Sequence, residues 1–233
     1  MPIHIAGVDE VGRGPLAGPV VAACAVFEQG QSTELFDDSK KLSAKKRESL
    51  IETICEQAVD WAIVSVNAPL IDRINIREAA KLAMSLAVRH CTADEVLIDG
   101  NMLIDTSLPQ QAIIKGDSLH GEISAASILA KVWRDGFLKE LGAQFPGYGL
   151  EQHAGYPTKT HKEAVAQLGV TPIHRFSFRG VREHVSEEML AETVRKEEVF
   201  LIRDTFTWDL GRAKCGSIPP LEGTPHHRPE LAA

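Results

Sequence analysis

Four acidic residues stand next to or near glycine at the ends of three short apolar stretches: Asp9-Glu10, Asp99-Gly100 and Gly116-Asp117. In an α/β sheet, strand ends are where side chains from different strands converge on one cleft. Clustered carboxylates repel one another unless cations neutralise them, and oxygen ligands without His or Cys suit Mg²⁺ or Mn²⁺. The pattern predicts a carboxylate site where two such ions act on the attacking and leaving oxygens of a phosphodiester.

A simpler interpretation stays open, because Asp beside glycine is common in turns and at helix caps. Asp9 and Glu10 are also adjacent, so a regular strand would turn them to opposite faces. They share one site only if the strand ends or kinks there, which the following Val-Gly-Arg-Gly favours. Recurrence at three strand ends favours the metal site, but spacing alone does not decide.

Two basic segments are candidates for contacts with phosphate. Gly12-Arg13-Gly14 follows the first carboxylates, and its glycines would let the backbone approach a ligand while Arg13 meets a phosphate. Lys40 stands in the stretch DSKKLS at residues 38–43. The alternatives are a glycine turn with a surface arginine, and a solvated loop that leads to a helix cap at Ser43.

The carboxylates need a sheet to position them, and apolar patterning predicts one. Strands are expected over residues 3–9, 20–27, 61–66, 95–98 and 111–114. Helices are expected over residues 44–58, from Asn75 to residue 91, and over residues 121–141. The last helix is rich in small residues that would let its backbone approach the sheet closely. The order β-β-α-β-α-β-β-α predicts an α/β domain around one mixed sheet.

The character of the chain changes after Gln144. A loop rich in glycine and proline leads through short helical pieces to residue 182, and one more helix is expected from Ser186 to about Phe206. The Pro, Gly and His content of residues 211–233 predicts a flexible tail. The expected division is a catalytic domain over 1–182, a helical extension over 183–210 and the tail.

Composition bounds the function. The chain has 233 residues, a formal net charge of −7 and four scattered cysteines without a C-x-x-C pair. These features argue against a zinc site, a disulfide framework and binding of nucleic acid by bulk charge alone. No apolar run is long enough to span a bilayer, and the first residues lack a signal-peptide pattern. A cytoplasmic monomer without a membrane partner is the default expectation.

Several motifs in register carry a family resemblance: GVDEVGRGPLAGPVVAA at 7–23, DSKKLS at 38–43, IDGN at 98–101, KGDS at 115–118, SAASILAKVWRD at 124–135 and GYPTKTH at 155–161. Together they resemble the type 2 ribonucleases H, the bacterial ribonuclease HII family, from about residue 5 to 182. The resemblance implies a ribonuclease H-like mixed five-stranded sheet flanked by helices, to which the C-terminal helical extension would be added.

The resemblance also implies a site. Its four metal-binding and catalytic carboxylates are Asp9, Glu10, Asp99 and Asp117. Gly12, Arg13 and Gly14 would contact the ribose 2′-hydroxyl, which distinguishes RNA from DNA, and Tyr156 would stack near the RNA-to-DNA junction. The implied activity is two-metal hydrolysis of the RNA strand of RNA–DNA hybrids, and cutting 5′ of single ribonucleotides in DNA, with 3′-hydroxyl and 5′-phosphate ends.

Other residues receive simpler interpretations. His161 and His174 are interpreted as loop histidines with satisfied hydrogen bonds. Lys131, Arg134 and Asp135 lie on the small-residue helix, where an ordinary solvated surface is the simple interpretation and the one kept for Asp135. The stretch HRFSF at 174–178 departs from the family pattern by a Phe in place of an Arg, and the resemblance gives no role to residues 186–233. Another carboxylate-metal phosphotransfer enzyme and a catalytically silent nucleic-acid-binding module remain alternatives.

Overall fold

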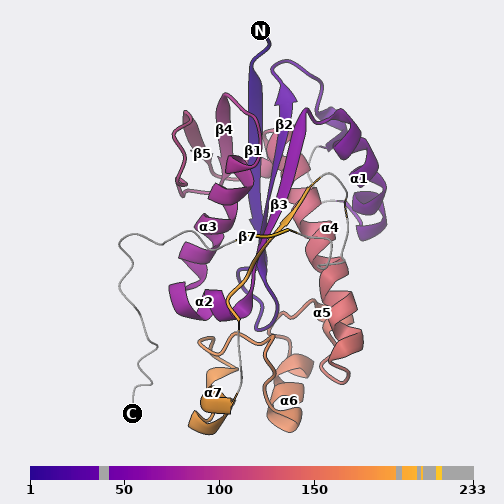
Figure 1. The fold of residues 1–233 in the computed structure, drawn as a ribbon. Helices are drawn as coiled ribbons and strands as arrows, with labels where there is room; N and C mark the ends of the chain where they lie inside the picture. The colour runs from indigo at the N-terminus through magenta and orange to yellow at the C-terminus, as the bar shows by residue number, and fades with distance from the viewer. Residues whose placement is uncertain (37–41, 193–195, 204–205, 207–213, 217–233) are drawn as a thin grey trace.

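The computed structural model describes residues 1–36, 42–192, 196–203, 206 and 214–216. Its centre is one mixed sheet of seven strands in the order β5-β4-β1-β2-β3-β6-β7 (Figure 1). The predicted α/β class and mixed sheet flanked by helices are confirmed. The sheet is wider than predicted, because two strands from the C-terminal part of the chain extend the five expected ones.

The five expected strands are β1 (His4–Val11), β2 (Val20–Glu28), β3 (Asp60–Val66), β4 (Glu95–Asp99) and β5 (Gln110–Ile113). β2 pairs antiparallel with both β1 and β3. β4 runs parallel to β1, and β5 runs parallel to β4. Because β1, β4 and β5 run in the same direction, their carboxyl ends lie at the same end of the sheet.

Helices cover both faces of the sheet (Figure 1). On one face lie α2 (Ala68–Ile74) and α3 (Ile76–Arg89), whose apolar side chains share a core cluster with β1 and β2. On the other face lie α1 (Ala44–Gln57) and α4 (Gly121–Gln144). The cap expected at Ser43 is confirmed, since Ser43 accepts from the backbone amide of Lys46, and Asn75, where the next long helix was expected to begin, accepts from those of Arg77 and Glu78.

The helix α4 lies directly against the centre of the sheet. A Cβ built on Gly7 of β1 would stand 2.0 Å from the carbonyl carbon of Glu122. No side chain fits in that gap, so the contact between β1 and the α4 backbone requires glycine at this position. The close approach brings the α4 side chains to the carboxyl end of β1, where Asp9 lies.

A third apolar cluster lies beyond the end of the sheet. It joins the C-terminal half of α4 to α5 (Leu150–His153), α6 (Lys159–Leu168) and the glycine-rich loop after β1. Short 3₁₀ helices occur at η1 (Glu34–Phe36), η3 (Gly116–Ser118) and η4 (Arg182–His184). None of the described helices is long and apolar enough to cross a membrane.

The prediction of one helix from Ser186 to Phe206 is wrong. The helix α7 covers only Glu187–Glu192, and β6 (Val199–Ile202) follows, antiparallel to β3. The physical reason is the run Val-Phe-Leu-Ile, whose β-branched and aromatic residues suit a strand and whose ends, Val199 and Ile202, are buried. Lys214–Gly216 forms β7 beside β6, so the tail predicted over 211–233 is not unstructured at these three residues. The other residues of that stretch lie outside the described part.

Candidate active site

The parallel strands bring three of the predicted carboxylates together at the carboxyl ends of the strands. Asp99 is the last residue of β4, and the β1–β4 register, with Val8 opposite Ile98, places Asp9 across from it. Asp117 lies in η3, shortly after β5, and its backbone amide donates to Asp99 Oδ1 over 3.3 Å. Asp99 and Asp117, which were predicted to converge, are therefore joined by a direct hydrogen bond.

Asp9 and Glu10 sit within a strand that continues past them. β1 keeps its register with β2 as far as Val11, so the strand ends one residue after Glu10. Asp9 faces α4, where the Ser127 side chain hydrogen-bonds it, and it is only 6% exposed. The backbone amide of Glu10 donates to Asp9 Oδ1 over 2.7 Å. The charges of Glu10 and Asp99 act on Asp9, and that of Asp99 acts on Glu10, so the three carboxylates lie near one another although regular alternation would separate Asp9 from Glu10.

Burial and like charge disfavour ionisation here. Burial raises the pKa of Asp9 to about 8, and the nearby charges of Glu10 and Asp99 add to the effect against the Ser127 hydrogen bond. Burial also raises the pKa of Glu10, although the ion pair between Arg13 NH1 and Glu10 Oε1, at 3.2 Å, opposes that shift. A bound cation would offset both the burial of these charges and the repulsion between them.

The four carboxylates offer the donors that Mg²⁺ or Mn²⁺ prefers, namely oxygens alone. Among the residues described, no three His, Cys, Asp or Glu side chains stand close enough together to hold a metal ion as they are. The repulsion among Asp9, Glu10 and Asp99 opposes a closer approach. The chemistry of the donor set and the raised pKa of Asp9 both fit a divalent cation.

The glycine-rich loop joins the carboxylates to Tyr156. Arg13 pairs with Glu10, as described, and its side chain is 48% exposed. A Cβ built on Gly14 would lie 3.8 Å from Cε1 of Tyr156, whose ring is also partly exposed. Lys131 of α4 places its Nζ 5.9 Å from the centre of the same ring. Arg13 and Gly14 therefore link the carboxylate of Glu10 to the ring of Tyr156. Lys40 lies outside the described residues.

Two buried arginines beside this loop were not predicted. Arg134, for which a solvated helix surface was only the simple interpretation, is 0% exposed, and so is Arg175. For Arg134 a signal was present, because it stands at steps of four residues from Ala126, Ala130 and Leu138, all buried. For Arg175 the loop sequence gave none. Asp135, in contrast, pairs with Lys131 over 2.9 Å at the surface, as predicted.

The expectation that His161 and His174 have satisfied hydrogen bonds is confirmed, although His161 lies in α6 and not in a loop. Both are fully buried, and their Nε2 atoms lie 3.3 Å apart. Their hydrogen bonds connect the segment of Tyr156 to the loop that precedes Arg175. The two histidines therefore support the Tyr156 segment from the protein interior.

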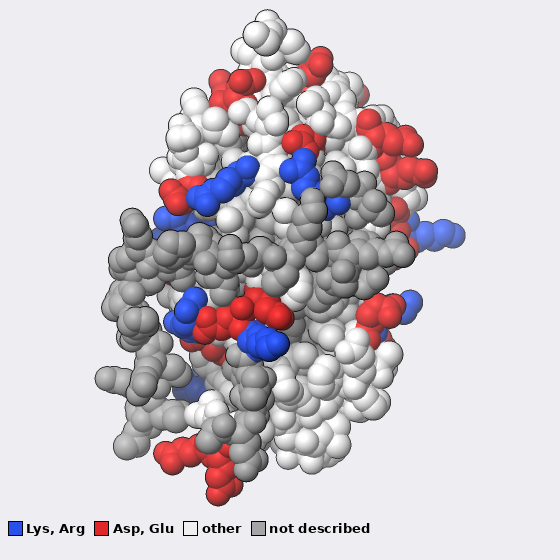
Figure 2. Space-filling view, in the orientation of Figure 1, with Lys and Arg blue, Asp and Glu red and all other residues white. Residues whose placement is uncertain are grey.

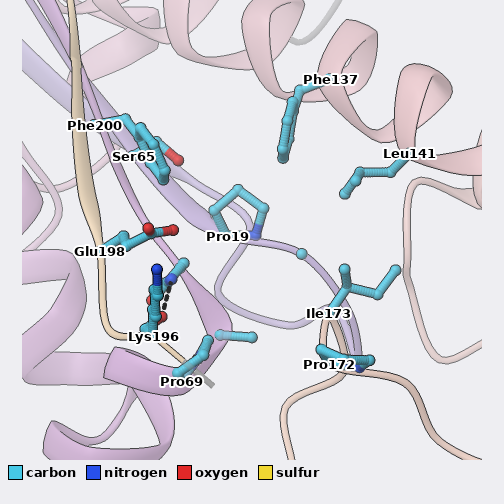
Figure 3. Close-up of a pocket in the computed structure, with 13 residues that line it drawn as sticks. Pro19, Ser65, Pro69, Phe137, Leu141, Pro172, Ile173, Lys196, Glu198 and Phe200 are labelled. Atoms are coloured by element: carbon cyan, nitrogen blue, oxygen red, sulfur yellow. Dashed lines mark hydrogen bonds between the residues drawn. The ribbon is translucent and has the colours of Figure 1, made fainter. Parts of the chain in front are cut away.

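A separate cavity of about 360 Å³ lies beside the ends of β3 and β6, next to the glycine-rich loop (Figure 3). Its walls include Phe137, Leu141, Ile173 and Phe200, and Pro19 projects into it from the glycine-rich loop. Glu198 and the Lys196 backbone, which accepts a hydrogen bond from Asn67, give it one polar side. None of the four carboxylates lines this cavity. On the face seen in Figure 2, the acidic and basic side chains of the described residues lie interspersed.

Comparison with known proteins places a fold and site of this kind among the ribonuclease H nucleases, which are hydrolases. The family model of ribonuclease HII matches residues 6–181. Ribonuclease HII of Myxococcus xanthus is 53% identical over 183 residues, which are 77% of this chain and 62% of that protein. Ribonuclease HII of Paracoccus denitrificans is 49% identical over 193 residues, 80% of this chain and 90% of that protein. The chain belongs to the ribonuclease HII family.

Solved structures agree on the fold. The crystal structure of ribonuclease H2 from Pyrococcus horikoshii has a TM-score of 0.69 and 26% identity, and the match covers 82% of this chain and 100% of that one. The structure of Bst-RNase HIII in complex with Mn²⁺ has a TM-score of 0.62 and 18% identity, over 82% of this chain and 71% of that one. The second likeness concerns the fold alone.

Proposed function

We propose that the chain is an endonuclease that hydrolyses the RNA strand of RNA–DNA hybrids and cuts on the 5′ side of single ribonucleotides in DNA. The products would carry 3′-hydroxyl and 5′-phosphate ends. The observation that supports this most is that two features of the molecule are in contact. Carboxylates meet at the ends of β1, β4 and β5, and the loop of Gly12, Arg13 and Gly14 continues from them to Tyr156.

Asp9, Glu10, Asp99 and Asp117 are the residues that would hold the metal, and Mg²⁺ or Mn²⁺ suits their oxygens. Two such ions, when bound, supply activation of a water and stabilisation of the leaving 3′-oxygen. A bound cation would favour the charged form of Asp9, because it would offset the burial and the like charges that raise the pKa of this carboxylate. Ser127 of α4 orients that carboxylate, and Arg13 restrains Glu10.

The loop and the tyrosine provide recognition of the substrate. Gly12, Arg13 and Gly14 contact the 2′-hydroxyl of the ribonucleotide, and Tyr156 stacks on the nucleotide beside it. Lys40 contacts a phosphate of the duplex. The protein acts as a monomer in the cytoplasm, with the duplex as its partner.

The alternatives predict different substrates. Another carboxylate-metal phosphotransfer enzyme would act without regard to the 2′-hydroxyl, and a silent binding module would not cut at all. Three matched duplexes distinguish them in Mg²⁺ or Mn²⁺: all-DNA, DNA with one ribonucleotide, and an RNA–DNA hybrid. We expect cutting 5′ of the ribonucleotide and within the RNA strand, with the all-DNA duplex intact. Folded protein that cuts none of the three, or all three equally, would refute the proposal.

A further inference from the structure

The glycine-rich loop owes its shape to two buried guanidinium groups. Arg175 donates from Nε to the carbonyl of Gly18 over 3.0 Å, from NH1 to that of Arg13 over 3.0 Å, and from NH2 to that of Gly12 over 2.6 Å. One side chain from the C-terminal part of the catalytic region thus holds both ends of the loop between β1 and β2.

Arg134 holds the same loop from the side of α4. Its Nε donates to the carbonyl of Pro19 over 3.0 Å, and its NH2 donates to that of Ala17 over 3.3 Å. Its NH1 donates to the carbonyl of Ala154 over 3.0 Å, two residues before Tyr156. Arg134 therefore ties the loop to the segment that carries the tyrosine.

Both arginines are buried at a cost that simple packing does not explain. Burial lowers the pKa of Arg134 to about 10 and also lowers the pKa of Arg175, on which the positive charge of Arg134 acts in the same direction. A neutral apolar side chain would fill the same volume without this cost. The five fixed donors of a guanidinium are the property that a hydrocarbon lacks, and here three donors on each side chain bond to carbonyls of the main chain.

Peptide geometry determines which way the amides of Arg13 and Gly14 point. The carbonyl and amide groups of a trans peptide point to opposite sides, and no described peptide bond is cis. With the carbonyls of Gly12 and Arg13 drawn onto Arg175, the amides of Arg13 and Gly14 must point away from it. Neither amide donates a hydrogen bond to any described residue. Two adjacent donors are therefore fixed and available at the loop, beside Tyr156.

We propose that Arg175 and Arg134 are positioning residues for recognition of the ribose. They hold the loop carbonyls inward so that the amides of Arg13 and Gly14 present a preformed pair of donors to the 2′-hydroxyl. This inference rests on the proposed function and adds to it the source of the ribose selectivity. Gly12 is part of the same device, since a Cβ there would stand 2.2 Å from Nε of Arg134.

The test is Arg175→Lys, which keeps the charge but replaces the planar fork by a single point of donation. The matched control is Arg203→Lys, because Arg203 also donates to a carbonyl, that of His90, but far from the loop. The kcat and KM of each protein are measured on the duplex with one ribonucleotide, at a temperature where thermal unfolding shows it to be fully folded. Binding of this duplex and of the all-DNA duplex is measured in the Asp9→Asn background.

We expect Arg175→Lys to lower kcat/KM at least tenfold and to abolish the preference in binding for the ribonucleotide, while Arg203→Lys changes both by less than twofold. Arg134→Lys is the second test, and the same result is expected there. Folded variants that cut within twofold of the parent and keep the binding preference would overturn the inference alone. A parent protein that cuts without dependence on the ribose would overturn the proposed function and this inference together.

Discussion

The imidazole rings of His161 and His174 meet through their Nε2 atoms, 3.3 Å apart in the protein interior. The backbone amide of Thr171 donates to Nδ1 of His174 over 3.1 Å, so that nitrogen carries no proton and the proton is on Nε2. His174 therefore donates to His161, whose Nδ1 in turn donates to the carbonyl of Tyr156 over 3.0 Å. Neutral rings are required at every step, and the chain of hydrogen bonds ends on the proposed stacking residue.

Acid should therefore weaken this region. Burial lowers the pKa of His161 below its ordinary value of 6.5, and the nearby His153 adds to this, while the Tyr156 carbonyl opposes it. The stabilisation from neutral His161 is complete above that ordinary value and is lost as the pH falls towards the lower pKa of the folded state. We expect the Tm of the wild-type protein to fall between pH 7.5 and 5.5. In His161→Gln the fall should be smaller, by about 2 °C.

His184→Gln is the control for that experiment, because His184 is exposed in η4. Its Tm should fall with pH as the wild-type Tm does. If His161→Gln loses as much stability on acidification as the wild type, proton uptake by the buried histidine is not the cause.

Asp9→Asn should separate stability from catalysis. The amide has the shape of the protonated acid, so it removes the cost of a buried charge beside Glu10 and Asp99. Without added metal at pH 8, we expect the variant to unfold at a higher temperature than the wild type. Cutting should fall about 10²- to 10³-fold, as is typical when one electrostatic contact to the reacting group is lost.

Added Mg²⁺ or Mn²⁺ provides the companion measurement. A ligand that binds only the folded state raises its stability, so either ion should raise the Tm of the wild type and raise that of Asp9→Asn much less. Glu163→Gln on α6 is the control, since Glu163 is an exposed acid paired with Lys159. Equal stabilisation of wild type and Asp9→Asn would show that Asp9 is not a metal ligand.

Gly12→Ala tests the packing of the glycine-rich loop, and Gly30→Ala provides a matched comparison. Both glycines have positive φ, +89° and +85°, so alanine costs about 1–2 kcal/mol of backbone strain at either. A Cβ at Gly30 meets nothing within 4 Å, whereas one at Gly12 would displace Arg134. We expect Gly30→Ala to keep full cutting activity on the single-ribonucleotide duplex. The activity of Gly12→Ala on the same duplex should be at least tenfold lower than that of Gly30→Ala. Similar activities would show that the loop tolerates the displacement.

The sequence predicted the elements whose patterning is local. The alternation in β1, the continuous apolar run of β2 and the three-and-four spacing of α3 each identify one element without knowledge of its neighbours. The stretch 199–202 was misassigned because its identity depends on a distant partner, the open edge of β3. Position 203 completes that docking through Arg203 and Asp60, which lie 3.2 Å apart although 143 positions separate them.

The candidate site was also predictable from the sequence only in part. Acidic residues beside glycine at strand ends could be found from spacing, and parallel strands brought Asp9 and Asp99 together as expected. The contacts of Arg134 and Arg175 could not be predicted, because their partners are backbone carbonyls, which every residue has. A side chain that recognises the main chain leaves no complementary residue in the sequence.

The strand β6 should be part of the same cooperative unit as the rest of the sheet, although the family match ends at residue 181. Ile202 is 2% exposed and packs in the core cluster on the α1 and α4 face, so Ile202→Ala should lower the free energy of unfolding by about 2–4 kcal/mol. Leu190→Ala on α7, where the side chain is 44% exposed, should change it by less than about 0.5 kcal/mol. Urea unfolding followed by tryptophan fluorescence measures both, since Trp61 and Trp133 belong to the same cluster as Ile202. A single transition with a lowered midpoint in Ile202→Ala is expected, because β6 closes over the edge of β3. An unchanged midpoint, or a separate early transition, would mean that the C-terminal strand folds apart from the catalytic region.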